Sequence, residues 1–191
     1  MEELKQLILS EGKNLGHGIL KVDSILNHQM YPVLMLNIGQ EIARRFAGER
    51  ITRILTAEVS GIGPALMTGL QLDVPVVYAR KRKPITMKEP VYVESAPSHT
   101  KGGETLLMVS PEFLSASDRI LIVDDFLASG KTIHALARLV LQAGAEVAGV
   151  ACVVEKTFEG GRAFLGDCCG RIESLVVITD MSDDRIIFAD D

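Results

Sequence analysis

The chain has 191 residues, of which 47% are hydrophobic and 24% charged, and its formal net charge at pH 7 is -5. This length and composition exclude a disordered or fibrous protein and predict one folded domain over residues 1–191, large enough to bury its own core. The negative charge balance gives no general attraction for nucleic acid or for an anionic membrane, so neither is expected as a partner.

The N-terminal segment and the cysteines indicate a cytoplasmic protein. Residues 1–6 include two glutamates and lack the basic segment and apolar run of a signal peptide. No apolar stretch approaches the ~20 residues that a helix needs to span a bilayer. The cysteines, Cys152, Cys168 and Cys169, lack the paired spacing of a zinc site. We therefore expect reduced thiols.

The first predicted elements alternate between helix and strand. Apolar residues at near-helical spacing predict a helix over 32–46, and residues 51–59 are typical of a strand. The glycine- and proline-containing segment 60–64 interrupts this strand before a short helix over 65–70 and a strand over 74–79. This order of strand, helix and strand is typical of a parallel sheet.

Segment 80–103 differs in composition from its surroundings. It begins with the cationic run 80–83 and continues with several prolines and glycines, which predicts a mobile, projecting segment. Residues 91–93 and 106–109 are expected to pair as the arms of a hairpin around its polar tip. From the pattern alone, four successive cations are most typical of a solvated surface.

A second unit of strand, helix and strand follows. Apolar runs predict strands over 120–123 and 147–154, with an amphipathic helix over 132–143 between them. Residues 175–178 and 186–188 are expected either to complete the sheet or to form a small flap. The order of elements predicts an α/β fold with a mainly parallel, twisted sheet flanked by helices.

The most informative motif is ILIVDDFLASGKT, residues 120–132. Asp124 and Asp125 follow a buried strand, at the edge where open α/β sheets bind ligands. Neighbouring side chains diverge, so one carboxylate is expected to face the ligand and the other to point inward. Residues 128–132 offer small side chains and backbone N–H groups at a helix N-terminus, which suits an anion. The motif therefore predicts a ligand that carries both hydroxyls and phosphate.

Two other interpretations of this motif compete with that prediction. Residues 130–132 match the end of a Walker A loop, but that pattern requires glycine where the chain has Asp125. A carboxylate there would repel nucleotide phosphates, which disfavours an ATPase or GTPase. The other interpretation is an ordinary turn between strand and helix, in which the acidic residues cap the helix.

Residues 120–132 closely resemble the phosphoribosyl diphosphate motif of the type I phosphoribosyltransferases, and the resemblance covers nearly the whole chain. It implies the fold of that family, with a flexible hood over 80–103 and a small base-binding region built from N-terminal and C-terminal segments. By this resemblance Asp124 and Asp125 would be catalytic residues that hold the ribose 2- and 3-hydroxyls. The residues implied to cradle the 5-phosphate are Ala128, Ser129, Gly130, Lys131 and Thr132.

Two further segments resemble the diphosphate-binding parts of the family. Residues 58–63, EVSGIG, lie at a strand end like the family's diphosphate loop, which implies Ser60 and Gly61 as ligand residues. By pattern alone this segment is equally typical of a tight turn into a helix. Lys81 would help to neutralise the diphosphate. Mg²⁺ is implied as cofactor, arriving with the diphosphate because it commonly binds through substrate phosphates, so no protein ligands for it are expected.

Segments 20–29 and 154–158 resemble the branch of the family that acts on xanthine. By this resemblance Leu20 and Asn27 would line the base pocket, and Lys156 would contact the purine, where a cation suits the carbonyl oxygens of xanthine. An asparagine both donates and accepts hydrogen bonds, so it can read a second oxo group. From pattern alone, a helix cap or turn is more ordinary for Asn27, and a solvated strand end for Lys156.

The resemblance implies an enzyme of purine salvage that transfers a phosphoribosyl group from 5-phosphoribosyl 1-diphosphate to xanthine. It also implies that the protein forms a homodimer. Ala128 stands where the hypoxanthine–guanine enzymes have an aspartate that is proposed to interact with the base, so no evident general base is present. Adenine enzymes also have alanine there, so an adenine or hypoxanthine–guanine specificity is the first alternative. A non-catalytic sensor of phosphoribosyl diphosphate is the second, although such regulators carry a DNA-binding domain for which this chain has no room.

Overall fold

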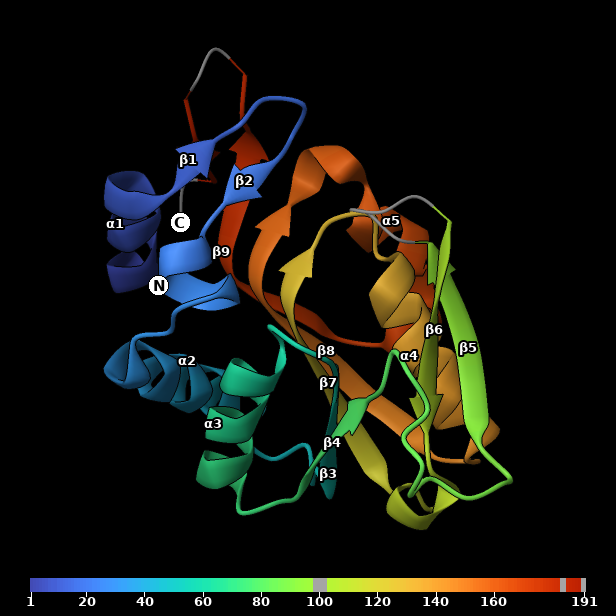
Figure 1. Ribbon diagram of the computed structural model, residues 1–191. Coiled ribbons are helices and arrows are strands. Elements are labelled where there is room, and N and C mark those ends of the chain that lie inside the picture. Colours follow the sequence, from blue (N-terminus) through green and yellow to red (C-terminus); the bar gives the residue numbers. More distant parts are fainter. Residues whose placement is uncertain (98–102, 183–184, 190–191) are drawn as a thin grey trace.

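A six-stranded sheet forms the centre of the computed structural model, which describes residues 1–97, 103–182 and 185–189 (Figure 1). The strands lie in the order β10-β9-β8-β7-β3-β4, and every neighbouring pair is parallel except β10 with β9. The bounds are Arg53–Ala57 for β3, Val76–Ala79 for β4, Arg119–Leu127 for β7, Glu146–Lys156 for β8, Ile172–Asp180 for β9 and Ile187–Phe188 for β10. The predicted α/β fold with a mainly parallel sheet is confirmed.

Helices cover both faces of this sheet (Figure 1). The helices α2 (Pro32–Arg45) and α3 (Ile62–Leu72) lie on one face, and α4 (Lys131–Gln142) lies on the other. Short helices connect the remaining elements: η2 (Pro111–Phe113), η3 (Thr157–Glu159), α5 (Gly161–Leu165) and η4 (Gly166–Cys169). Within the described ranges, none of the helices has the length and apolar character that crossing a membrane would require.

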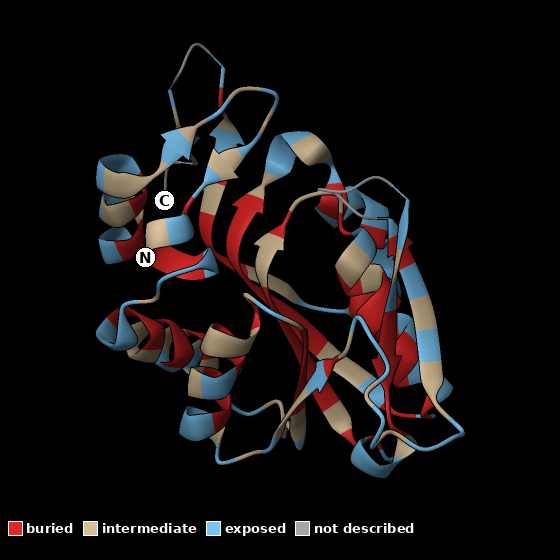
Figure 2. Cartoon of the chain, viewed as in Figure 1, coloured by how far each residue is buried: buried red, intermediate tan, exposed pale blue. Residues whose placement is uncertain are grey.

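The central strand β7 is buried on both faces, as its continuous apolar run predicts. Ile120 and Ile122 belong to the core under α4, whereas Leu121 and Val123 belong to the core under α2. Successive side chains of a strand point to opposite faces, which explains this alternation. Figure 2 shows the resulting buried band along the middle of the sheet.

Several predicted elements are longer in the structure than their sequence patterns indicated. Strand β7 continues to Leu127, so the acidic pair lies within the strand rather than after it. Helix α3 begins at Ile62, directly after the predicted diphosphate loop, and not at residue 65. The helix predicted over 132–143 is α4, and Gly144, with a φ of +70°, follows its end. The predicted βαβ unit is confirmed, because β3 and β4 are parallel neighbours on either side of α3.

The predicted hairpin in the hood is confirmed as β5 (Tyr92–Pro97) and β6 (Glu104–Val109). The two strands are antiparallel, with Tyr92 opposite Val109 and Pro97 opposite Glu104. Ala96 and Leu107 belong to the hydrophobic core under α4, so the hairpin is docked beside that helix (Figure 1). The predicted tip, 98–102, lies outside the described residues.

The N-terminal region is a separate layer that the sequence patterns did not predict in full. It contains helix α1 (Glu2–Glu11), a hairpin of β1 (Lys13–Asn14) with β2 (Leu20–Lys21), and the π-helix η1 (Asp23–Asn27). Its buried side chains join the core that lies under α2, and the Met1 amino group donates a hydrogen bond of 3.0 Å to the Leu175 carbonyl of β9. This layer therefore lies beside the C-terminal strands (Figure 1).

Candidate functional site

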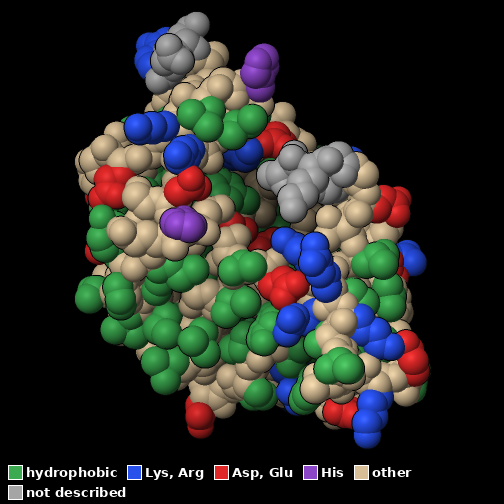
Figure 3. Space-filling model, viewed as in Figure 1, with side chains coloured by type: hydrophobic (Ala, Val, Ile, Leu, Met, Phe, Trp, Pro, Cys, Tyr) green, Lys and Arg blue, Asp and Glu red, His purple; other side chains and the backbone are tan. Residues whose placement is uncertain are grey.

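A cavity of about 960 Å³ lies over the carboxyl ends of β3, β7 and β8. Its walls come from the N-terminal layer on one side and from the β5–β6 hairpin on the other. Acidic and basic side chains gather near the middle of this face of the molecule (Figure 3). Ligands of open α/β sheets bind at this edge, so the fold places the cavity where chemistry is expected.

The two carboxylates of the acidic pair have different environments. Asp124 is only 5% exposed, whereas Asp125 is partly exposed in the cavity. The backbone N–H of Asp125 donates a hydrogen bond of 3.1 Å to Asp124 Oδ1. Burial and the nearby charge of Asp125 raise the pKa of Asp124 well above its ordinary value, and Lys81 opposes this shift. The pair thus differs in burial, although both residues line the cavity.

The segment after the pair forms a turn against the cavity. Residues 128–132 all line it, and α4 begins at Lys131 within this segment. Gly130 has a φ of +77°, a conformation that favours glycine, and its carbonyl accepts the first helical hydrogen bond, from His134 N at 2.9 Å. The N–H groups of the first helical turn have no partner within a helix, so this end of α4 is suited to an anion.

At the predicted diphosphate side of the cavity, the Glu58 carboxylate binds the first residues of the hood. Glu58 Oε1 accepts a hydrogen bond from the Lys81 backbone N–H at 2.6 Å, and Glu58 Oε2 forms an ion pair with Arg80 Nε at 2.9 Å. These contacts hold the start of the hood at the strand end, where Glu58, Ser60 and Lys81 line the cavity. The Glu58–Val59 peptide bond is cis. The solvated-surface interpretation of this cationic run is therefore incomplete, because Arg80 and Lys81 are both tied to the site.

Gly61 is the single predicted site residue that does not line the cavity. A Cβ at this position would overlap Thr56 Oγ1 and lie 3.0 Å from Asp124 Oδ1. The glycine therefore lets the loop lie directly against the ends of β3 and β7. Its place in the structure is behind the cavity wall.

The opposite end of the cavity is built around Lys156, whose side chain is only 11% exposed. Its Nζ donates a hydrogen bond of 2.9 Å to the Gly18 carbonyl and forms an ion pair with Glu159. The same nitrogen lies 5.8 Å from the ring centroid of Phe126 and 5.9 Å from that of Phe158. Lys156 is thus an enclosed cation between two aromatic rings, and the interpretation as a solvated strand end is wrong.

Leu20 and Asn27 also line the cavity, and their role in binding the base stays a prediction. Asn27 is the last residue of η1, and its Nδ2 donates a hydrogen bond of 3.4 Å to Asp125 Oδ2. This bond joins the predicted base pocket to the predicted ribose site. The amide is therefore directed to the acidic pair rather than serving only as a helix cap.

Sequence patterns missed several residues of this cavity. Two of them are aromatic: Phe126 directly follows the predicted Asp125, and Phe158 stands two residues after the predicted Lys156, so closeness to a motif was the available signal. The turn 16–18 has three successive positive φ values, and its role over the cavity depends on contacts with the distant segment 156–159. The hairpin also contributes residues that no motif indicated: Ala96, Pro97, Thr105 and Leu107.

The described carboxylates that line the cavity are not arranged as a protein metal cage. Among residues 1–97, 103–182 and 185–189, no group of three or more His, Cys, Asp or Glu side chains is arranged to hold a metal ion. Asp124 and Asp125 nevertheless supply carboxylate oxygens, the ligand type that Mg²⁺ prefers.

Residues 21–162 match the family model described as "Phosphoribosyl transferase domain". The chain is 47% identical over 190 residues to a "Xanthine phosphoribosyltransferase" of Ectopseudomonas mendocina, with 100% of both chains covered. It is 48% identical over 188 residues to a protein of the same name from Moorella thermoacetica, covering 98% of this chain and 96% of the other. A solved adenine phosphoribosyltransferase of Thermoanaerobacter pseudethanolicus has a TM-score of 0.75 at 26% identity, covering 92% of this chain and 98% of that one. The chain belongs to the phosphoribosyl transferase domain family.

Proposed function

We propose that the chain is a xanthine phosphoribosyltransferase, a pentosyltransferase of purine salvage. It would transfer the 5-phosphoribosyl group of 5-phosphoribosyl 1-diphosphate to xanthine and release xanthosine 5'-phosphate and diphosphate. The observation that carries this proposal is the enclosed cation Lys156 at one end of a cavity whose other side is formed by residues 128–132. The relatives with about half their residues identical are named for the same activity.

The phosphoribosyl part would bind over the end of β7. The N–H groups of residues 128–132 would bind the 5-phosphate at the N-terminus of α4, with help from the helix dipole. The partly exposed carboxylate of Asp125 and the more buried one of Asp124 would bind the ribose 2- and 3-hydroxyls. Both residues line the cavity next to this turn.

The chemical step breaks the bond between C1 and the diphosphate while a ring nitrogen of the base attacks C1. Positive charge builds on the ribose and negative charge on the diphosphate, so preorganised charges of both signs lower the barrier. Asp124 and Asp125 would stabilise the ribose, and Lys81 and Ser60 would bind the diphosphate on the other side. Ala128 leaves no general base in the turn, which suits an acidic purine such as xanthine.

Lys156 would select the base. An ammonium group has three donors, and Gly18 and Glu159 account for two partners. The third donor would serve a carbonyl oxygen of the purine, and Phe126 and Phe158 would flank its ring. Asn27 would read a second oxo group from the side of the acidic pair.

Mg²⁺ would enter with the diphosphate. Asp124 and Asp125 fit an ion of this kind in ligand chemistry but would be engaged by the ribose, so diphosphate oxygens and water would supply most of the coordination. When bound, the ion would neutralise charge on the leaving diphosphate. The hood that starts at Arg80 would close over the site and exclude water from the reacting centre.

The active form would be a cytoplasmic homodimer. Apolar side chains are exposed together on α2, α3 and the loop before α3: Val33, Val59, Leu66 and Leu70. Figure 3 shows hydrophobic atoms gathered over this part of the surface. An exposed apolar patch next to the predicted diphosphate loop is typical of a protein–protein interface, and a second copy would cover it.

The deciding experiment is nucleotide formation from 5-phosphoribosyl 1-diphosphate and Mg²⁺ with xanthine, guanine, hypoxanthine, adenine, uracil or orotate in parallel. The highest kcat/KM is expected with xanthine. A preference for adenine would instead favour the activity of the structural relatives, and a preference for guanine or hypoxanthine would leave the reaction and change the base. Tight binding of phosphoribosyl diphosphate without turnover on any base would indicate a sensor.

A further inference from the structure

Helix α5 lies in direct backbone contact with the turn 128–132. A Cβ on Gly161, the first residue of α5, would overlap the Ala128 carbonyl oxygen and lie 2.7 Å from Gly130 N. A Cβ on Gly130 would in turn lie 2.8 Å from the Gly161 carbonyl oxygen. Real Cβ atoms do not approach other atoms so closely. Two glycines therefore let the backbone of α5 lie directly against the turn.

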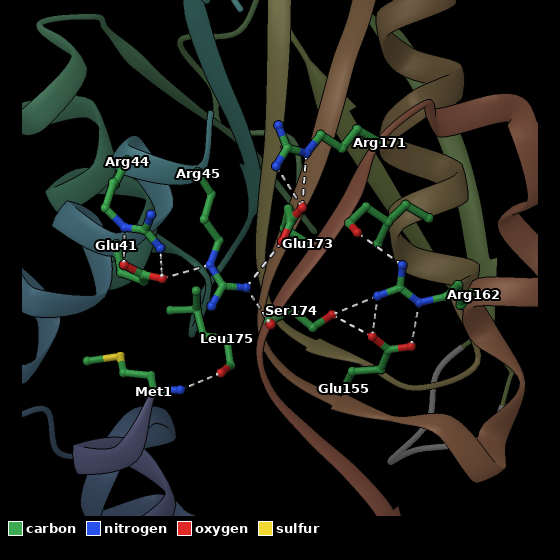
Figure 4. A network of polar contacts seen from close by, with 11 residues as sticks. Met1, Glu41, Arg44, Arg45, Glu155, Arg162, Arg171, Glu173, Ser174 and Leu175 are labelled. Atoms are coloured by element: carbon green, nitrogen blue, oxygen red, sulfur yellow. Dashed lines mark hydrogen bonds and ion pairs between the residues drawn. The ribbon is translucent and has the colours of Figure 1, made fainter. Parts of the chain in front are cut away.

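A five-residue helix has little stability of its own, so α5 needs an anchor. Arg162 provides it by a bidentate pair with Glu155 of β8, with Nε to Oε1 at 2.8 Å and Nη2 to Oε2 at 2.5 Å (Figure 4). Arg162 Nη1 also donates to the Ile172 carbonyl at 3.0 Å. Planar bidentate pairs of this kind fix orientation as well as distance.

The anchor is buried on the strand side. Glu155 is 2% exposed, and its Oε2 also accepts a hydrogen bond from Ser174 Oγ at 2.6 Å. Burial raises the pKa of Glu155, but the hydrogen bonds from Arg162 and Ser174 and the charge of Arg162 outweigh it, so the net pKa is lowered and the carboxylate stays charged. Glu155 directly precedes Lys156, whose side chain faces the cavity. The end of β8 thus connects the base pocket to α5.

We propose that Gly161 and the Glu155–Arg162 pair are positioning residues for the turn 128–132, setting the location of the backbone N–H groups that bind the 5-phosphate. This inference rests on the proposed function, because it takes that turn as the phosphate site. None of the three residues lines the cavity. Their effect would fall on binding of the phosphorylated ribose, and not on binding of the diphosphate at the other side of the cavity.

The neighbouring part of the polar network in Figure 4 offers a matched control. Arg45 of α2 is also an arginine paired with carboxylates, with Glu41 at 2.8 Å and Glu173 at 3.2 Å, and it donates to the Ser174 carbonyl at 2.9 Å. It has no contact with α5 or with the turn among these partners. Gly160 is the control for the glycine, since a Cβ there would meet nothing within 4 Å. Its φ of +73° is tolerated by asparagine, so Gly160→Asn adds a side chain without a clash.

The test compares Gly161→Ala and Arg162→Lys with Gly160→Asn and Arg45→Lys in the full chain. Isothermal titration calorimetry measures the binding of ribose 5-phosphate and, separately, of diphosphate with Mg²⁺, and steady-state kinetics gives KM for phosphoribosyl diphosphate and for xanthine. Displacement of aligned groups by a fraction of an ångström to 1 Å costs up to about 100-fold, so about tenfold weaker ribose 5-phosphate binding is expected for Gly161→Ala. Arg162→Lys keeps the charge but loses the bidentate geometry, and a smaller loss of about threefold or more is expected.

In both test variants diphosphate binding and KM for xanthine should stay within twofold of the native chain, and both controls should match it throughout. Native-like ribose 5-phosphate binding by Gly161→Ala and Arg162→Lys would overturn the positioning role. Equal weakening of ribose 5-phosphate binding and of diphosphate binding would also overturn it and indicate general destabilisation. An insoluble Gly161→Ala together with native-like binding by Arg162→Lys would do the same. Failure of the native chain itself to bind ribose 5-phosphate would refute the proposed phosphate site, which is a different result.

Discussion

Asn27 Nδ2 donates a hydrogen bond of 3.4 Å to Asp125 Oδ2, across 98 positions of sequence. The bond links the N-terminal layer to the acidic pair at the end of β7. The Asn27 amide therefore contacts Asp125, which is proposed to bind the ribose, and it also lines the proposed base pocket. Binding of the two substrates is expected to be coupled through it.

Replacing Asn27 with alanine tests this coupling. A single neutral hydrogen bond contributes about 0.5–1.5 kcal/mol, so kcat/KM for xanthine is expected to fall about two- to tenfold from the loss of one contact. Because the same amide orients Asp125, KM for phosphoribosyl diphosphate should rise as well. Steady-state kinetics with each substrate varied in turn measures both effects. An increase confined to the KM for xanthine would show that the bond to Asp125 has no functional role.

Removing the charge of each acidic residue should separate activity from stability. Asp124→Asn and Asp125→Asn are each expected to lower kcat/KM by about 10²–10³-fold, as for other lost groups that stabilise transition-state charge. The native chain buries the Asp124 carboxylate at a cost, so Asp124→Asn should have an equal or higher free energy of unfolding. Denaturant unfolding measures this. A loss of activity that is matched by a comparable loss of stability would show that the pair is structural.

The raised pKa of Asp124 predicts a pH dependence of stability. Its ordinary value is 3.8, and in the folded chain the group keeps its proton to higher pH. The folded state then binds more protons than the unfolded state. Protonation of Asp124 therefore contributes to the free energy of unfolding in full below the ordinary pKa, and this contribution is lost as pH rises through the folded pKa. The free energy of unfolding of the native chain, measured from pH 4 to 8, should include this decrease. The Asp124→Asn variant should lack it, and parallel curves for the two chains would contradict the prediction.

Replacing Lys156 with methionine keeps the apolar stem and removes the charge. Hydrogen bonds to charged groups contribute about 1.5–3 kcal/mol, so kcat/KM for xanthine is expected to fall about 10- to 100-fold. Turnover of adenine, which has no carbonyl oxygen, should change much less. Competition between the two bases in one assay measures the change in preference. Equal losses with both bases would indicate that Lys156 supports the pocket without reading the base.

The proposed homodimer predicts a specific effect of charge on α3. Leu70 on α3 and Leu141 on α4 are each 64% exposed, but only Leu70 belongs to the apolar patch on α2 and α3. Leu70→Asp should raise the dissociation constant of the dimer at least about tenfold, since a buried charge at an interface is costly. Leu141→Asp should leave it unchanged. Sedimentation velocity over a range of concentrations distinguishes the two, and a monomeric native chain would refute the proposed dimer.

Contiguous motifs made the sheet and the centre of the site predictable from the sequence. The run 120–132 specifies a buried strand, an acidic pair and a helix start within a few neighbouring residues, so short-range geometry places them together. The alternating order of strands and helices likewise predicts the parallel sheet. These features need no knowledge of distant contacts.

The tertiary structure decided how the base end of the site is assembled. Lys156 reaches the Gly18 carbonyl of the N-terminal layer across 138 positions, and the Phe126 ring beside it comes from a different strand, β7. The contact between Gly161 and the turn 128–132 similarly joins two backbones that no local pattern relates. Burial and pKa depend on all the groups around a side chain, and those groups come from segments that only folding brings together.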